Sequence, residues 1–187
     1  MRRSRWTCDQ GVMRLGVKFG ILALGVAALA AWSLAGCRFH SREITSLDRK
    51  EAASLASEGR FAATLKEWPR AEGLFAQAAE KCPDTGEYWV SLGIARVSLG
   101  KRSEAKDAYV SAVSAYEDAA KAAPASTQPI LQKIYVLALL GRVDEARLVL
   151  EKERGRLPED RDLRMFAESR ELDRLLADPG FRQIALH

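Results

Sequence analysis

Apolar residues recur through most of this chain at intervals of three and four, which is the spacing of one face of an α-helix. Small and large members alternate within the pattern, as at Ala71, Phe75 and Ala78, where a proline follows at position 83. Alanine and leucine are abundant, whereas the β-branched residues that favour strands are few. The pattern therefore predicts an all-α chain whose helices pack closely.

The pattern recurs with a fixed period. It starts at Ala71 and starts again 34 residues later at Ala105, and Gly93 follows Gly59 at the same distance. Because two independent marks share one period, the sequence indicates repeated helix hairpins. A third copy starts at Ala146.

One interval is longer than the others. Ala105 and Ala146 are 41 residues apart, as are Pro83 and Pro124, whereas Pro124 and Pro158 are again 34 apart. The seven extra residues therefore lie between positions 105 and 124, where the pattern A-x-x-x-Y-x-x-A occurs twice. Seven residues make about two helical turns, roughly 10 Å, and keep the apolar face in register. We therefore expect one long helix here.

The second copy carries a recognisable motif. Trp89, Leu92 and Gly93 form W-x-x-L-G, and A-x-x-x-Y-x-x-A follows after a short polar turn. This order resembles the tetratricopeptide (TPR) motif, a helix-turn-helix unit of about 34 residues, although Arg96 replaces the usual tyrosine. The resemblance implies a TPR-like helix-hairpin superhelix of about three repeats within 51–160, at 52–85, 86–126 and 127–160. Residues 161–187 are expected to form C-terminal capping helices over the last repeat.

The resemblance also assigns a binding surface, since the first helices of TPR repeats line a concave face. The positions it assigns to a partner-binding groove are Arg60, Thr64, Glu87, Val90, Ile94, Val97, Leu131, Tyr135 and Leu139. The middle of this surface is apolar, which favours a partner helix or another apolar segment. The alternative is that the chain's own tail, or a second copy in a homo-oligomer, buries these residues.

Residues 1–36 read as a signal peptide, because a basic start precedes an apolar run at 19–35 and small residues. The ending L-A-G-C resembles the lipobox of bacterial lipoproteins, in which the cysteine receives acyl chains such as palmitate and becomes the first residue. The resemblance implies that Cys37 is lipidated and that the chain faces the periplasm from the inner or the outer membrane. The alternative is an uncleaved transmembrane helix, for which the run is barely long enough.

The start of the mature chain contributes two further expectations. Residues 37–50 are polar and without a sustained apolar period, so we expect a tether between the lipid and the helices, with Ser46 as the N-cap of the first helix. Because the stretch before Met13 is long for a leader, Met13 is an alternative to Met1 as the start of translation.

Charge and side-chain chemistry exclude several functions. The formal net charge is +4, and residues 1–36 account for all of it with five basic residues and one acidic residue. The remainder is neutral, which argues against nucleic acid as a partner. The only histidines are His40 and His187, and no catalytic, phosphate-binding or metal-binding motif is present. We therefore expect no enzymatic activity, cofactor or metal, and we expect Cys82 to be a packed residue.

These observations predict a membrane-anchored scaffold of the bacterial envelope that binds a protein or peptide in its groove. The alternative is a structural subunit of a homo-oligomer or an envelope complex, such as a pilus, secretion or outer-membrane assembly, with its groove permanently filled. A third hypothesis is an accessory to a cell-wall enzyme.

Overall fold

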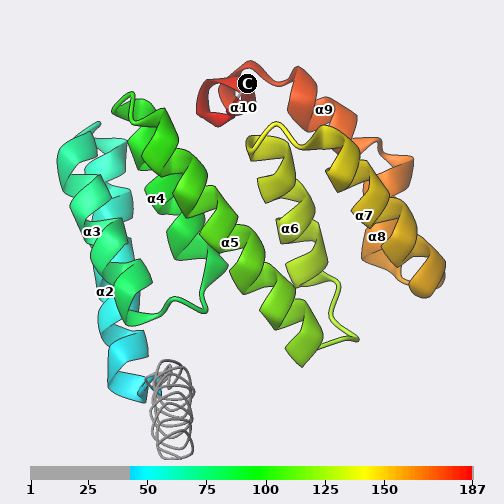
Figure 1. The fold of residues 1–187 in the computed structure, drawn as a ribbon, viewed down its shortest axis with the longest axis horizontal. Helices are drawn as coiled ribbons and strands as arrows, with labels where there is room; N and C mark the ends of the chain where they lie inside the picture. The colour runs from blue at the N-terminus through cyan, green and yellow to red at the C-terminus, as the bar shows by residue number, and fades with distance from the viewer. Residues whose placement is uncertain (1–42, 187) are drawn as a thin grey trace, which may run out of the picture. The chain divides into compact units, whose positions relative to one another are not determined.

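The computed structural model describes residues 43–186, in which helices joined by short turns account for the whole fold and no strand occurs (Figure 1). The helices are α2 (Ser46–Thr64), α3 (Trp68–Lys81), α4 (Gly86–Ser98), α5 (Arg102–Ala122), α6 (Gln128–Leu139), α7 (Val143–Arg156), α8 (Arg161–Glu168), α9 (Glu171–Ala177) and α10 (Pro179–Ile184). The predicted all-α class is confirmed. None of these helices is long and apolar enough to cross a membrane.

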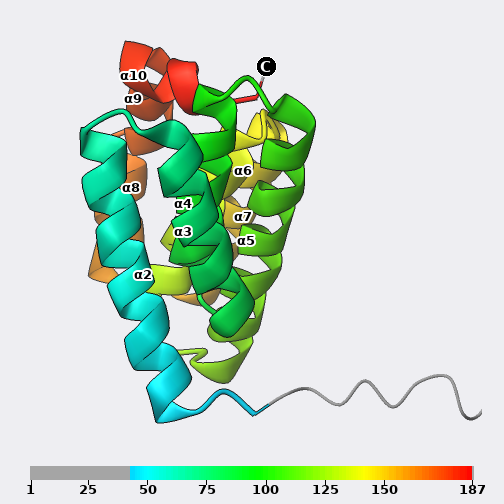
Figure 2. The ribbon, with the colours of Figure 1, turned by 90° about the vertical axis from the view of Figure 1, so that its left-hand side faces the viewer.

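Helices α2 to α7 form three hairpins, α2–α3, α4–α5 and α6–α7, that pack in chain order, each helix against its neighbours in sequence (Figures 1 and 2). Each hairpin turns through a residue with positive φ: Lys66 at 60°, Gly100 at 75° and Gly141 at 73°. Glycine adopts this conformation at no steric cost, so the second and third turns are relaxed. The first turn places a lysine there and is strained.

Two hairpins bring an aromatic ring against a glycine. A Cβ atom added at Gly93 would lie 2.2 Å from Cε1 of Tyr109, and one added at Gly59 would lie 2.8 Å from Cε1 of Phe75. Only glycine therefore leaves room for the ring. The third hairpin has isoleucine and leucine at the corresponding positions, 134 and 150, and both are buried.

The long helix that the spacing predicts is α5. It has 21 residues, whereas α3 and α7, the second helices of the other hairpins, have 14 each. The difference equals the seven-residue insertion, which is present as two further turns. The apolar face stays in register along α5, whose buried residues are Ala105, Ala108, Tyr109, Ala112, Val113 and Ala115.

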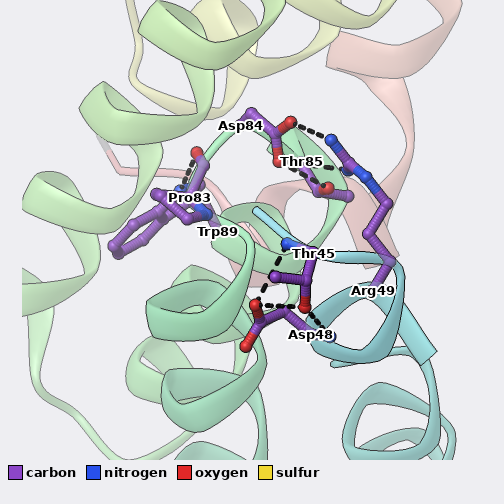
Figure 3. A network of polar contacts seen from close by, with 7 residues as sticks. All are labelled: Thr45, Asp48, Arg49, Pro83, Asp84, Thr85 and Trp89. Atoms are coloured by element: carbon purple, nitrogen blue, oxygen red, sulfur yellow. Dashed lines mark hydrogen bonds and ion pairs between the residues drawn. The ribbon is translucent and has the colours of Figure 1, made fainter. Parts of the chain in front are cut away.

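The first helix begins earlier than the sequence predicts. Helix α2 starts at Ser46, and its N-cap is Thr45, not Ser46. The Thr45 hydroxyl accepts a hydrogen bond from the Asp48 N–H at 3.1 Å, and the Asp48 carboxylate accepts one from the Thr45 N–H at 3.1 Å (Figure 3). This reciprocal capping box fixes the start. Residues 46–50 therefore belong to α2 and not to the predicted tether.

The predicted signal peptide, the lipidated Cys37 and the rest of the predicted tether lie outside the described residues. Beyond the cap, an ion pair joins α2 to the loop between α3 and α4: Nη2 of Arg49 lies 2.7 Å from Oδ2 of Asp84 (Figure 3). Nearby, Nε1 of Trp89 donates to the carbonyl of Pro83 at 2.9 Å. The motif tryptophan thus secures the loop between the first two hairpins as well as filling space.

Helices α8 to α10 follow the third hairpin. Helix α9 packs against α6, and α10 packs against both α4 and α6. Asp178 ends α9 and caps α10, since its carboxylate accepts from the Phe181 N–H at 2.7 Å. The final segment therefore turns back onto the first helices of hairpins two and three.

Candidate functional site

The predicted groove residues fall into three groups. Arg60, Thr64 and Glu87 are exposed, and Leu139 is fully buried. The other five are half-buried and pack against one apolar cluster: Val90, Ile94, Val97, Leu131 and Tyr135. The structure therefore corrects the placement of Leu139, which is a core residue at the end of α6.

The chain's own tail covers part of the predicted groove. We use "tail" for residues 178–186, which comprise α10 and the residues on either side of it. Phe181 is 5% exposed and meets Tyr135 edge-on, with ring centroids 5.4 Å apart and an interplanar angle of 75°. Ala185 is 1% exposed. Of the two occupants that the sequence left open, the tail is therefore the one that buries this end of α4 and α6.

Three hydrogen bonds hold the tail by its backbone. The Tyr109 hydroxyl donates to the Ile184 carbonyl at 2.8 Å, and Nη2 of Arg102 donates to the Ala185 carbonyl at 3.4 Å. The Leu186 N–H donates to the Leu139 carbonyl at 2.7 Å. That carbonyl has no partner within α6, because it lies in the last turn, so the tail acts as its cap.

The site that receives the tail, which we call the tail slot, consists of Arg102, Tyr109, Tyr135, Leu139 and Gly141. The Leu186 carbonyl oxygen would lie 2.6 Å from a Cβ atom at position 141, so this close approach also requires glycine. Burial raises the pKa of Tyr109 well above its ordinary value. The hydroxyl therefore stays protonated and serves as a hydrogen-bond donor at any physiological pH.

The opposite end of α4 and α6 is open. A cavity of ≈ 410 Å³, which we call the open pocket, lies there between the N-terminal turns of the two helices and the second half of α5. It is lined by Asp84, Thr85, Gly86, Glu87, Tyr116, Ala119, Gln128, Pro129 and Gln132. Tyr116 and Ala119 belong to the second copy of the A-x-x-x-Y-x-x-A pattern. The insertion therefore builds the floor of this pocket.

The open pocket presents neutral polar groups. Gln128 and Gln132 lie one turn apart on α6, and neither amide is hydrogen-bonded to another described side chain. The Tyr116 ring covers Gly86, where an added Cβ atom would lie 2.6 Å from its Cζ. Burial raises the pKa of Tyr116 to about 12, so its hydroxyl is neutral. These groups can bind a peptide backbone or an uncharged polar side chain.

The charges around the open pocket are paired. Nη1 of Arg60 lies 3.2 Å from Oε1 of Glu87, and Asp84 pairs with Arg49. These side chains are about half exposed, and such pairs contribute little to stability because water and salt screen them. The pocket therefore has no net charge that would select a strongly charged ligand.

The described residues can be checked for two kinds of reactive group, a metal-binding cluster and an activated thiol. Residues 43–186 contain no group of three histidine, cysteine or acidic side chains able to hold a metal ion. Cys82 is 1% exposed, and burial raises the pKa of its thiol, so it is poorly nucleophilic.

Sequence reasoning missed most of the residues that form these two sites. The second A-x-x-x-Y-x-x-A copy was a signal for Tyr116, because it marks where an extra aromatic residue faces the core side of α5. No pattern pointed to Gln132, and none pointed to Arg102 or Tyr109 as partners of the tail.

Comparison with known proteins identifies no family. No protein-family model matches the chain, and no curated protein matches its sequence. Among solved structures it is similar to the Arabidopsis OM64 TPR domain, with 16% sequence identity and a TM-score of 0.40 over 68% of this chain and 98% of that one. The described architecture is all-α and TPR-like. Its helix hairpins stack in chain order, and the first two contain glycine–aromatic contacts.

Proposed function

We propose that this protein is a scaffold that binds a segment of a partner protein between α4 and α6, with the open pocket as the anchoring point. The observation that carries the proposal is the pocket between three helices, in which Gln128, Gln132 and Tyr116 have unused hydrogen-bonding capacity. These groups are not buried, so water can reach them, and the polar groups of a bound peptide can replace that water. We propose no enzymatic role.

We further propose that acyl chains on Cys37 anchor the protein in a bacterial membrane, with the helices on the periplasmic side. The L-A-G-C sequence and the basic, apolar leader support this proposal. Nine residue steps separate Cys37 from Ser46, and each spans at most about 3.5 Å. Helix α2 would then begin within roughly 30 Å of the lipid, so the scaffold would act on partners close to the membrane surface.

A structural subunit of a larger envelope complex is the second candidate, and one observation favours it. Leu47 and Phe61 on α2, and Leu65 at its C-cap, are 62%, 60% and 53% exposed. Their spacing of 14 and 4 residues puts them on one stripe of the helix. Glu51, Ser54 and Glu58 lie on the same face between Leu47 and Phe61, so the apolar surface that a permanent neighbour can cover is the pair Phe61 and Leu65.

The test of the primary proposal is site-specific crosslinking in membranes with a photoreactive residue at position 132. We expect partner adducts there and none from the same residue at position 148, whose native leucine is 69% exposed on α7. The double variant Gln128→Ala/Gln132→Ala should lower partner capture roughly tenfold, since two hydrogen bonds contribute about 1–3 kcal/mol.

Gln77→Ala is the matched control, because it removes an exposed amide from α3 without touching the pocket. Unchanged capture of every partner by the folded double variant would refute the proposal. Light scattering addresses the second candidate: an obligate oligomer that Phe61→Ser dissociates would favour the structural role.

A further inference from the structure

We propose that the tail slot is itself a peptide-binding site, with the chain's own tail as its resident ligand. The external ligand is a partner segment with the tail's pattern: an aromatic residue followed three and five positions later by aliphatic residues, with a small residue between them. This inference rests on the proposed function, because it names the partner class for the same pair of helices.

The slot recognises backbone, which any peptide carries. Its three hydrogen bonds go to the Ile184 carbonyl, the Ala185 carbonyl and the Leu186 N–H, never to a tail side chain. A foreign segment in the same conformation offers the same groups. The slot supplies their partners from two helices, since Arg102 and Tyr109 belong to α5 and the Leu139 carbonyl belongs to α6.

The tail's side chains define which segment fits. Phe181 packs edge-on against Tyr135, and Ile184 and Leu186 join the same apolar cluster. Ala185 is 1% exposed, so a larger residue has no room there. A matching ligand therefore has an aromatic anchor, two aliphatic residues and one small residue, in a segment that starts as a short helix and becomes extended at the small residue.

The tail is also suited to leave the slot. Helix α10 has six residues, too few for a helix that is stable alone. No described ion pair joins the tail to the slot, and the Arg182 guanidinium bonds only to the Ala177 carbonyl just before the tail. When the tail leaves the slot, no buried charge therefore loses its partner. Water can then reach the Tyr109 hydroxyl and the Leu139 carbonyl.

The covalent attachment of the tail determines how strongly a free peptide can compete with it for the tail slot. A tail attached through Asp178 competes at an effective concentration in the millimolar range, so a free peptide binds the native chain weakly. A substitution that weakens only the tail should therefore strengthen binding of the free peptide. Unchanged binding of the free peptide would show that the slot accepts this segment only as part of the folded chain.

The experiment titrates a fluorescein-labelled peptide with the sequence of residues 178–187 against the full chain and follows fluorescence anisotropy. Phe181→Ser in the protein should raise the affinity for the labelled peptide about tenfold or more, because the peptide keeps its phenylalanine. Leu148→Ser is the matched control and should change nothing, since that side chain is 69% exposed on α7. A peptide that carries serine in place of its phenylalanine should not bind.

If Phe181→Ser unfolds the protein, amide hydrogen exchange on the unaltered full chain provides an independent test of the proposal. The Leu186 amide should exchange at least about a hundredfold faster than the amide of Leu137 in the core of α6, because the tail opens locally. Equal protection of the two amides would overturn the proposal, as would unchanged peptide affinity in folded Phe181→Ser. A dimer formed by exchange of tails would also overturn it, because a second copy would then be the occupant.

The two proposals fail separately. If position 132 gives no partner crosslinks while the labelled peptide still binds Gln128→Ala/Gln132→Ala, the result counts against the proposed function alone. Partner crosslinks at position 132 without peptide binding to Phe181→Ser count against the tail slot alone.

Discussion

The first and third hairpins have the same shape but different interiors. The core of α2 is built from alanine at positions 52, 56 and 62, with Phe75 of α3 lying on Gly59. The core of α6 is built from Ile130, Ile134, Leu137 and other aliphatic residues. Small residues let two helices approach closely but bury little apolar area, whereas aliphatic residues fill a wider gap and bury more. The same helix-hairpin backbone is therefore packed in two ways, with small residues in the first hairpin and aliphatic residues in the third.

The first hairpin compensates with polar contacts to its neighbours. Glu72 on α3 is held by Arg96 at 3.3 Å and by Lys101 at 2.6 Å. The hydrogen bond from Lys101 is the main reason that the pKa of Glu72 is lowered. Arg96, the departure from the tetratricopeptide motif, thus replaces an aromatic contact with an ion pair. The third hairpin has the tail and α9 over α6 instead.

The largest expected difference is in the cost of truncating a core side chain. Ile134→Ala should lower the free energy of unfolding by about 2–5 kcal/mol, because Ile134 is 0% exposed and its truncation leaves a cavity in the core. Leu55→Ala, at a half-buried position in the first hairpin, should cost clearly less. Urea unfolding followed by circular dichroism measures both. Equal costs would contradict the comparison.

The next effect tests the close approach that the first two hairpins share. Gly93→Ala should cost about 1–3 kcal/mol, because the Tyr109 ring is pinned by its bond to the Ile184 carbonyl and cannot move aside. Gly59→Ala should cost less, since Phe75 has no hydroxyl to hold it. Gly73→Ala is the control: nothing lies within 4 Å of its added Cβ, and it should stabilise α3 by roughly 0.5–1 kcal/mol. Thermal unfolding of the three variants gives the order.

The smallest effect concerns the turns. Lys66→Gly should stabilise the protein by about 0.5–1 kcal/mol, since it relieves a lysine at φ 60° and matches the glycines of the other two turns. Lys50→Gly, in the exposed interior of α2, should instead destabilise by about 1 kcal/mol. If both substitutions destabilise alike in chemical denaturation, the first turn carries no strain.

Features that depend on local spacing were predictable from the sequence. The shift from 34 to 41 residues located the insertion within α5, because a helix absorbs seven residues without rotating its apolar face. The first N-cap was misplaced by one residue, because Ser46 and Thr45 are both good caps. The choice depends on which of them finds an acidic partner three residues later, and Asp48 suits Thr45.

The binding surface was predictable only in part. Leu139 occupies a position that faces the groove in the repeat pattern, yet it is buried, because the tail lies over the end of α6. The open pocket depends on where the two extra turns of α5 place Tyr116 relative to Gly86, which the sequence alone does not show.

The sequence by itself determined the helices, their pairing and the length of α5, because these follow from contacts between residues a few turns or one repeat apart. Only the tertiary structure decided what covers the groove. Tyr109 and Ile184 are 75 residues apart, and the bond between them joins a side chain to a backbone carbonyl. Every residue carries such a carbonyl, so no residue pattern marks the one that the tail presents.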